Sequence, residues 1–542
     1  ILLGKPPIQP RRDQRVKIDL PPVRLLDQSW DEMAKAVLRH PTVANKQFLI
    51  TIGDRSVTGL VARDQMVGPY QVPVSDCAVT SRDYAGVAGE AMAMGERTPL
   101  AVINAKAASR MAVAESITNI AGADVNGIDK IKLSANWMAA CGVAGQDAAL
   151  YDAVQSVGLE LCPALGVSIP VGKDSLSMKT TWQEQSEEKS VVSPVSLIVT
   201  AFAPVEDVRQ TVTPELKALD QETVVLFIDL AKGKKRLGGS IAAQVVNQYG
   251  DQVPDVEDPV LLKNAFAALR QLKDEQLVLA YHDKSDGGLW ATLCEMSFAS
   301  HTGISLQVDN LLIDSVDQMG IDDAKNWTEQ VSGTRPERIM RALFNEELGM
   351  CIQVLRANRS RVVDILREHG LSPLTQQIAT PNQEDTIEIY VDGKVFYRES
   401  RVALQDEWQK VSYHIAKMRD NPECVDAEYA KMSTKEGLVA QLSFTMPLSM
   451  PVIGGVKPKM AIWREQDMAG SVLPIVVSHG EGRAQFAEYI DPKSLPITLQ
   501  YVDSQGKPTQ SYPENPNGSP DAIAGMTTRD GRVTIMMPHP ER

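Results

Sequence analysis

Short apolar runs alternate with longer alanine-rich stretches along most of this chain. A short apolar run is typical of a buried strand, and an alanine-rich stretch with helical periodicity is typical of an α-helix. Before residue 206, the pattern predicts strands at 48–52, 72–80 and 195–201 and helices at 105–121 and 146–159. This alternation predicts one α/β domain over residues 46–205.

The alternation continues over residues 206–410, after an acidic turn at Glu206 and Asp207. The expected strands are 224–230, 277–281, 303–308 and 351–355, and the expected helices are 258–274, 289–298 and 360–369. Residues 206–410 are therefore expected to form a second α/β domain.

The remaining segments have different patterns. Residues 1–45 begin rich in proline and arginine, which predicts a connector that leads into a short helix around 30–38. Residues 411–456 are polar and contain several turn signals, so we expect an irregular linker. An apolar run at 460–463 opens a third unit, 457–542, which we expect to be an incomplete domain.

Composition narrows the function classes. A formal net charge of −14 over 542 residues opposes a nucleic-acid-binding protein, which needs clustered lysine and arginine. The six cysteines form no C-x-x-C pair, so neither a disulfide framework nor a cysteine zinc site is indicated. No apolar run is long enough to predict a membrane span. We expect a cytoplasmic enzyme with reduced thiols, and the lack of an initial Met suggests that the natural protein begins earlier.

Oxygen-bearing side chains occur in positions that suit a magnesium site. Asp76 ends an apolar run, and Asp283 follows the predicted strand 277–281, where ligands of α/β sheets gather. Glu115 and Asn119 are four residues apart in a predicted helix, so they project from one face. Carboxylate and amide oxygens are the ligands that Mg²⁺ prefers, often together with substrate phosphates. The alternatives are a solvated helix face for Glu115 and Asn119 and an ordinary turn for the Asp-Gly-Gly sequence after Asp283.

Two glycine-bearing segments could bring backbone amides close to a phosphate. Residues 53–69 carry Arg and Asp between glycines, and residues 171–178 carry Lys173 after Gly172. Neither segment has the P-loop spacing, and ordinary turns are an equally good interpretation. The acidic segment 344–349 has the same two interpretations.

The carboxy-terminal segment contains a possible base and orienter. Pro540 favours an extended conformation at His539, which places His539 and Glu541 on one face. A His that activates a thiol and a carboxylate that orients the imidazole are typical of cysteine amide hydrolysis. Residues 457–542 contain no Cys, however, and the alternative is a surface His beside a turn. Cys141, the one Cys followed by Gly, is expected to be a small core residue.

Several motifs together resemble the second half of the long, single-chain phosphoribosylformylglycinamidine synthase family. The segments of the first two domains are 63–69, 132–137, 170–175, 281–288 and 344–349, in that order. Residues 477–483, 515–520 and 538–542 resemble the family's glutaminase domain. The resemblance covers nearly the whole chain.

The resemblance implies an α/β (α+β) architecture with two aminoimidazole ribonucleotide synthetase-like domains and a partial, flavodoxin-like class I glutaminase domain. It further implies that Asp76, Glu115, Asn119 and Asp283 bind Mg²⁺ and that Ser75 and Ser285 contact ATP or ADP. In the family, this site resembles an auxiliary nucleotide site related by pseudo-symmetry to the catalytic one. His539 and Glu541 match the base and orienter of the glutaminase triad.

The implied activity is an ATP-dependent ligation in purine biosynthesis. Formylglycinamide ribonucleotide is converted to formylglycinamidine ribonucleotide with ammonia from glutamine, and ADP, phosphate and glutamate are released. The family's first synthetase half and the glutaminase segment with the nucleophilic Cys are not in this sequence, so we expect the chain alone to be inactive as a glutaminase. The alternative hypothesis is a noncatalytic nucleotide-binding scaffold that organises the complex and an ammonia path.

Overall fold

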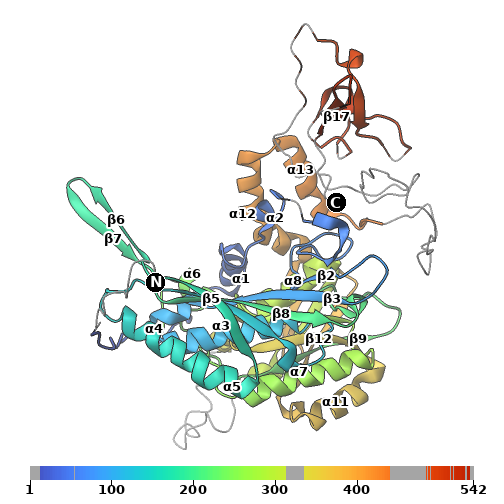
Figure 1. Cartoon of the computed structure of the whole chain (residues 1–542). Coiled ribbons are helices and arrows are strands. Elements are labelled where there is room, and N and C mark those ends of the chain that lie inside the picture. Colours follow the sequence, from blue (N-terminus) through green and yellow to red (C-terminus); the bar gives the residue numbers. More distant parts are fainter. Residues whose placement is uncertain are drawn as a thin grey trace, which may run out of the picture.

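The computed structural model describes residues 12–53, 55–312, 335–439 and most of 484–536 (Figure 1). Its first domain contains a six-stranded sheet with the order β1-β2-β3-β8-β4-β5, in which only β4 and β5 pair in parallel. The strands are β1 (Val61–Arg63), β2 (Ala78–Ser81), β3 (Gly89–Glu96), β8 (Ser196–Val205), β4 (Lys132–Met138) and β5 (Ser168–Ser175).

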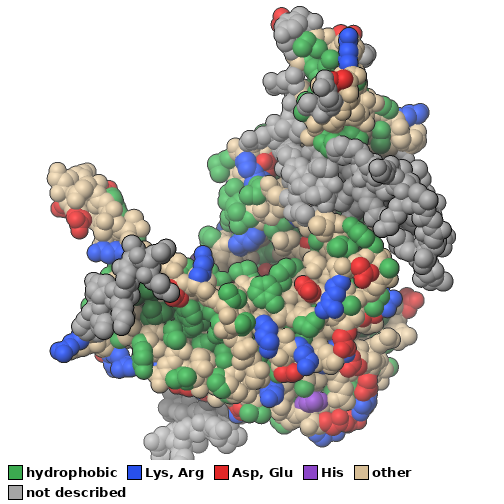
Figure 2. All heavy atoms as spheres, viewed as in Figure 1, with side chains coloured by type: hydrophobic (Ala, Val, Ile, Leu, Met, Phe, Trp, Pro, Cys, Tyr) green, Lys and Arg blue, Asp and Glu red, His purple; other side chains and the backbone are tan. Residues whose placement is uncertain are grey.

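One face of this sheet packs against helix α3 (Ala105–Ile120), whose first turn is capped by the side chain of Asn104. Strand β3 alternates accordingly, with Ala91 and Ala93 buried and Met92 and Met94 exposed. In Figure 2, hydrophobic side chains gather on the face of the first domain that is turned toward the viewer. Helix α4 (Gln146–Gln155) and α5 (Cys162–Leu165) follow, joined by a π-helical segment at Ser156–Leu161.

The second domain contains a seven-stranded sheet with the order β10-β12-β9-β13-β11-β14-β15. Its strands are β9 (Thr223–Asp229), β10 (Ala280–Lys284), β11 (Gly303–Gln307), β12 (Gly349–Leu355), β13 (Thr375–Asn382), β14 (Thr386–Val391) and β15 (Lys394–Ser400). The apolar run of β9 is buried on both sides, which explains why it lacks alternation.

Two hydrophobic cores cover the two faces of this sheet. Val224 and Leu226 face a core that includes α7 (Pro259–Asp274), α11 (Arg359–Glu368) and α3 of the first domain. Val225 and Phe227 face a core formed with helices α1 (Trp30–Arg39), α8 (Gly288–Ser300), α10 (Arg335–Phe344) and α12 (Arg401–Arg419). Because the first core contains residues of both sheets, the two domains are packed into one unit.

Two small elements lie outside these cores. Strands β6 (Lys179–Glu184) and β7 (Glu187–Val192) form a hairpin that projects from the first domain (Figure 1). A three-stranded antiparallel sheet near the carboxy terminus consists of β16 (Ile497–Gln500), β17 (Ile523–Thr527) and β18 (Thr534–Met536). Within the described residues, no helix is long and apolar enough to cross a membrane.

The predicted mixed α/β fold and most of the long elements are confirmed, but several local predictions are wrong. The apolar run 48–52 contains helix α2 (Gln47–Ile50), and only the end of 72–80 is a strand. Residues 171–175 belong to β5 rather than to a phosphate loop. Residues 411–430 are largely helical, in α12 and α13 (Pro422–Ala430), rather than irregular. The predicted strand 460–463 lies outside the described residues.

Candidate functional site at the domain interface

A pocket of about 330 Å³ opens where the two domains meet. The first domain contributes the loop before β2 and one position of α3, and the second contributes β10, the turn after it and α8. Its polar lining includes Asn45, Lys46, Ser75, Asp76, Asn119, His282, Asp283, Ser285, Asp286, Thr292 and Glu295. The structure therefore brings five of the predicted residues (Ser75, Asp76, Asn119, Asp283 and Ser285) to one pocket.

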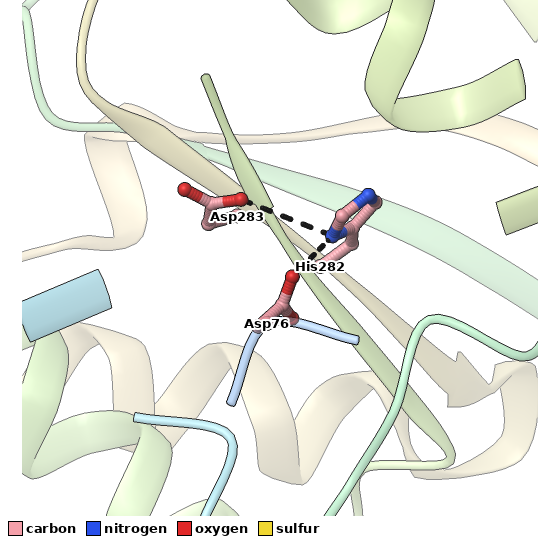
Figure 3. Close-up of side chains that lie close together, drawn as sticks. All are labelled: Asp76, His282 and Asp283. Atoms are coloured by element: carbon pink, nitrogen blue, oxygen red, sulfur yellow. Dashed lines mark hydrogen bonds and ion pairs between the residues drawn. The ribbon is translucent and has the colours of Figure 1, made fainter. Parts of the chain in front are cut away.

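Asp76, His282 and Asp283 form a compact cluster in this pocket (Figure 3). Each residue offers one ligand atom, and these atoms lie within 4.8 Å of one another. His282 Nδ1 lies 2.6 Å from Asp76 Oδ1 and 3.9 Å from Asp283 Oδ1. Because Asp76 belongs to the first domain and Asp283 to the second, the cluster spans the interface.

The two aspartates are buried in a way that disfavours their negative charge. Burial raises the pKa of Asp76, and burial together with the neighbouring Asp76 carboxylate raises the pKa of Asp283 well above its usual value. The Oδ2 atoms of both residues are buried without a hydrogen-bond partner among the described residues. An unpartnered buried carboxylate oxygen costs stability, and a divalent cation is a ligand that could satisfy such an oxygen.

Of the two predicted ligands on helix α3, Asn119 lines the pocket, whereas Glu115, one turn earlier, is neither among the described residues of the pocket lining nor part of the cluster. The Glu115 Oε2 atom accepts a hydrogen bond of 2.6 Å from the backbone amide of Glu96, and Asn119 donates through Nδ2 to the Met94 carbonyl at 2.8 Å. Burial raises the pKa of Glu115 to about 7 despite the opposing charge of Arg97. The predicted ligands that do line the pocket, Asp76, Asn119 and Asp283, carry carboxylate and amide oxygens, a donor type that fits Mg²⁺.

Helix α3 is held against β10 and α7 of the second domain by buried hydrogen bonds. The Tyr281 hydroxyl donates to the Thr118 carbonyl at 2.6 Å. The Lys273 ammonium donates to the carbonyls of Ala121, at 2.8 Å, and Ala123 at the end of α3. These bonds fix the position of Glu115 and Asn119 relative to Asp283, which lies two residues after Tyr281.

The acidic turn at 344–349 supports the site structurally. Glu346 Oε1 accepts hydrogen bonds of 2.9 Å from the amides of Gly287 and Ile241, and Asn345 Oδ1 accepts one of 2.6 Å from Lys284 Nζ. The turn therefore holds the loop after β10, and the structure favours the structural interpretation over a phosphate loop.

Sequence reasoning did not assign a role to His282, Glu295 or Lys46. His282 lies within the motif that contains Asp283, so its position beside a candidate ligand was the available signal. Lys46 lines the pocket and donates to the carbonyls of Thr42, at 3.0 Å, and Ala44. No periodicity marks Glu295, which becomes a pocket residue only through the packing of α8.

The other candidates lie elsewhere or outside the described residues. Arg55 and Asp64 from the segment 53–69 form an ion pair of 2.9 Å with each other. Cys141 packs at the edge of a small core in the first domain, as the sequence predicts. His539 and Glu541 lie outside the described residues.

Three family models match the chain in order. An FGAR-AT PurM_N-like domain model matches residues 45–204, and the model of the C-terminal domain of AIR synthase related proteins matches 224–392. A CobB/CobQ-like glutamine amidotransferase domain model matches residues 452–542. The first two models correspond to the two domains that form the pocket.

Solved structures match parts of the chain at low sequence identity and with TM-scores below 0.5. Thermotoga maritima PurL complexed with FGAR is 13% identical, covers 69% of this chain and 53% of its own length, and has a TM-score of 0.49. PurLQS from the same organism is 14% identical with coverages of 71% and 54% and a TM-score of 0.46. The hydrogenase maturation protein HypE of E. coli is 14% identical with coverages of 56% and 84% and a TM-score of 0.38. The chain thus spans about half the length of the PurL structures that it matches.

Proposed function

This chain belongs to the phosphoribosylformylglycinamidine synthase (FGAR amidotransferase) family, and we propose that it supplies the second synthetase half and part of the glutaminase domain of that enzyme. The enzyme would convert formylglycinamide ribonucleotide to formylglycinamidine ribonucleotide in purine biosynthesis, with ATP and glutamine. The order of the three family models favours this ligase over a noncatalytic scaffold. The six free cysteines fit a reducing, cytoplasmic environment.

We further propose that the interface pocket holds Mg²⁺ and an adenine nucleotide, ATP or ADP. The observation that carries this proposal is the pair of buried, unpartnered Oδ2 atoms of Asp76 and Asp283 in one pocket. Asp76, Glu115, Asn119 and Asp283 would hold the metal, and Ser75 and Ser285 would contact the nucleotide. Bound Mg²⁺ would neutralise phosphate charge and fix the position of the phosphates.

The chain's own residues would prepare the pocket for this ligand. The two domains, proposed as 46–205 and 206–410, place the ligands on separate elements. Hydrogen bonds from Tyr281 and Lys273 of the second domain to helix α3 of the first hold these elements in place. Arg97 lies behind Glu115, with 3.9 Å between Nη1 and Oε1, and offsets part of the carboxylate charge there. The pocket is therefore organised before the ligand binds, which lowers the entropic cost of binding.

The carboxy-terminal unit, proposed as 457–542 after a linker at 411–456, would contribute to the glutaminase. His539 would act as the base toward the nucleophilic thiol, and Glu541 would orient its imidazole. We propose that the thiol comes from a segment that is not in this sequence, and that the first synthetase half is likewise a separate part of the enzyme. These two parts of the same enzyme are the chain's proposed partners, together with formylglycinamide ribonucleotide and ammonia from glutamine.

Ligand binding by site variants tests the proposed pocket. Copurifying nucleotide is removed under mild denaturation with EDTA, and binding of ADP and ATP is then measured by calorimetry with and without Mg²⁺. We expect Asp76→Asn and Asp283→Asn each to weaken Mg²⁺-dependent binding roughly tenfold or more. Asp364→Asn, on the exposed face of α11, is the control and should bind like the wild type. Unchanged Mg²⁺-dependent binding in the double variant would contradict the proposed site.

A further inference from the structure

His282 lies between two carboxylates that come from different parts of the fold. Its Nδ1 atom is 2.6 Å from Asp76 Oδ1 in the first domain, and its Nε2 atom is 2.9 Å from Glu295 Oε2 on α8. Ionised carboxylates only accept hydrogen bonds, so each ring nitrogen is placed to donate one. The side chain of His282 is 8% exposed, and that of Asp76 is 4% exposed. Asp76, His282 and Glu295 are thus linked by two largely buried hydrogen bonds across the domain interface.

The contact with His282 distinguishes the two oxygens of Asp76. Oδ1 accepts the hydrogen bond from Nδ1, whereas Oδ2 is buried and has no partner among the described residues. A carboxylate held through one oxygen has a fixed plane, so its second oxygen has a fixed direction. Figure 3 shows one ring nitrogen of His282 facing one carboxylate oxygen of Asp76 and one of Asp283, while the second oxygen of each aspartate points away from the ring.

We propose that His282 is a positioning residue that orients the Asp76 carboxylate for a divalent cation and is itself held by Glu295. This inference rests on the proposed Mg²⁺ site and adds a residue that acts through Asp76 without binding the metal. Residues that orient a metal ligand by hydrogen bonding usually contribute about 10–100-fold to metal affinity.

Direct coordination of the metal by His282 is the competing interpretation, since one ring nitrogen of His282 lies within 4.8 Å of a carboxylate oxygen of Asp76 and of Asp283. The geometry opposes it, because both ring nitrogens already face carboxylate oxygens at hydrogen-bond distance. A nitrogen that donates a hydrogen bond has no lone pair for a metal. Mg²⁺ also prefers oxygen ligands, which Asp76 and Asp283 provide.

Two amide substitutions separate the two hydrogen bonds of His282. The amide nitrogen of Asn is as many bonds from Cβ as Nδ1, and the amide nitrogen of Gln is as many bonds from Cβ as Nε2. His282→Asn therefore keeps a donor for Asp76, whereas His282→Gln keeps a donor only for Glu295. His369→Gln, at the end of α11 and bonded to Gln271, is the matched control outside the pocket.

Calorimetric titration of the nucleotide-free protein with Mg²⁺, at fixed ADP, provides the test. We expect His282→Gln and His282→Ala to weaken Mg²⁺ about 10–100-fold, with His282→Asn restoring affinity to within roughly threefold of the wild type. ADP binding in EDTA should be the same in all variants that show a wild-type unfolding transition. Equal losses in the Asn and Gln variants, or no loss in either, would overturn the proposal.

A spectroscopic measurement on the wild type keeps the proposal testable if the variants fold poorly. Mn²⁺ replaces Mg²⁺, and electron spin echo measurements detect the strong ¹⁴N coupling of a directly bound imidazole. We expect no coupling of that strength, and its presence would show that His282 is a ligand. If the wild type binds neither Mg²⁺ nor Mn²⁺, the proposed metal site itself is wrong. That outcome differs from one in which the wild type binds the metal but the His282 variants do not show the expected order of Mg²⁺ affinities.

Discussion

Arg97 and Glu346 form a buried ion pair across the domain interface, with 2.6 Å between Nη2 and Oε2. Arg97 follows β3 of the first domain, and Glu346 lies in the turn before β12 of the second. The same guanidinium lies 3.4 Å from Asp286 and 3.9 Å from Glu115. One buried cation therefore faces three carboxylates directly behind the pocket.

Replacing Arg97 should destabilise the whole interface. Arg97→Met leaves the Glu346 carboxylate buried without its cation, and breaking a buried pair in this way costs about 3–5 kcal/mol. Urea unfolding of the two-domain unit measures the change. Arg367→Met, which removes an exposed pair with Asp364, is the control and should change stability by less than about 1 kcal/mol. A loss at Arg97 no larger than the loss at Arg367 would show that the carboxylates are neutral or solvated.

Asp283→Asn should separate stability from ligand binding. The pKa of Asp283 is raised by burial and by Asp76, so its ionised form opposes folding at neutral pH when no metal is bound. We expect the variant to match or exceed the wild type in thermal stability in EDTA, and to lose the additional stability that Mg²⁺ and ADP give the wild type. At a ligand concentration about 100 times Kd, that addition is roughly 2.7 kcal/mol. A variant that is less stable in EDTA yet still stabilised by Mg²⁺ would contradict this assignment.

Mg²⁺ affinity should rise with pH through the titration of Glu115. Its pKa is raised to about 7, so protons compete with the metal below that pH and cease to compete above it. From pH 6 to pH 8 the ionised fraction of one such group rises about tenfold, which predicts a similar gain in affinity. Calorimetry at several pH values measures the gain. Glu115→Gln should bind Mg²⁺ more weakly and with a flatter pH profile, and an unchanged profile would assign the titration to another group.

The sequence predicted the secondary-structure elements and the types of ligand residue better than it predicted the contacts between elements that are distant in the sequence. Helix 105–121 and strand 224–230 follow from clear patterns, and they are confirmed within one residue at each end. The run 48–52 formed a helix because it packs against α12, a long-range contact that local propensity does not contain. In the same way, Asp76 and Asp283 were identified separately, but the role of Glu295 depends on how α8 packs beside β10.

Glutamine hydrolysis provides a separate prediction for the carboxy-terminal unit. Residues 457–542 contain no Cys, so His539 would have no thiol to activate within this segment. We expect the chain alone to release no glutamate from glutamine in a coupled dehydrogenase assay. Glutamate release that is lost in His539→Ala would contradict this and would require a cysteine from another domain, with Cys141→Ser as the first variant to test.

Strand β3 and helix α3 approach each other closely at Gly95. A Cβ atom there would lie 2.1 Å from the Ala112 carbonyl oxygen and 2.5 Å from the Ser116 amide nitrogen, both in the helix backbone. The neighbours of Gly95 hold the ligands, since the Met94 carbonyl accepts from Asn119 and the Glu96 amide donates to Glu115. The missing side chain of Gly95 therefore sets the distance at which α3 presents both ligands.

Gly95→Ala should consequently damage the metal site as well as the fold. The added methyl group must push α3 away from β3, which costs about 1–3 kcal/mol as overpacking and lengthens the two hydrogen bonds that orient Glu115 and Asn119. We expect lower stability in urea together with a Mg²⁺ affinity reduced roughly tenfold, measured on the fraction that remains folded. Gly53→Ala, where a Cβ atom would have nothing within 4 Å, is the matched control and should change neither quantity. If Gly95→Ala destabilises the protein but leaves Mg²⁺ binding like that of the wild type, the position of α3 does not determine the affinity. The metal would then depend on Asp76 and Asp283 alone.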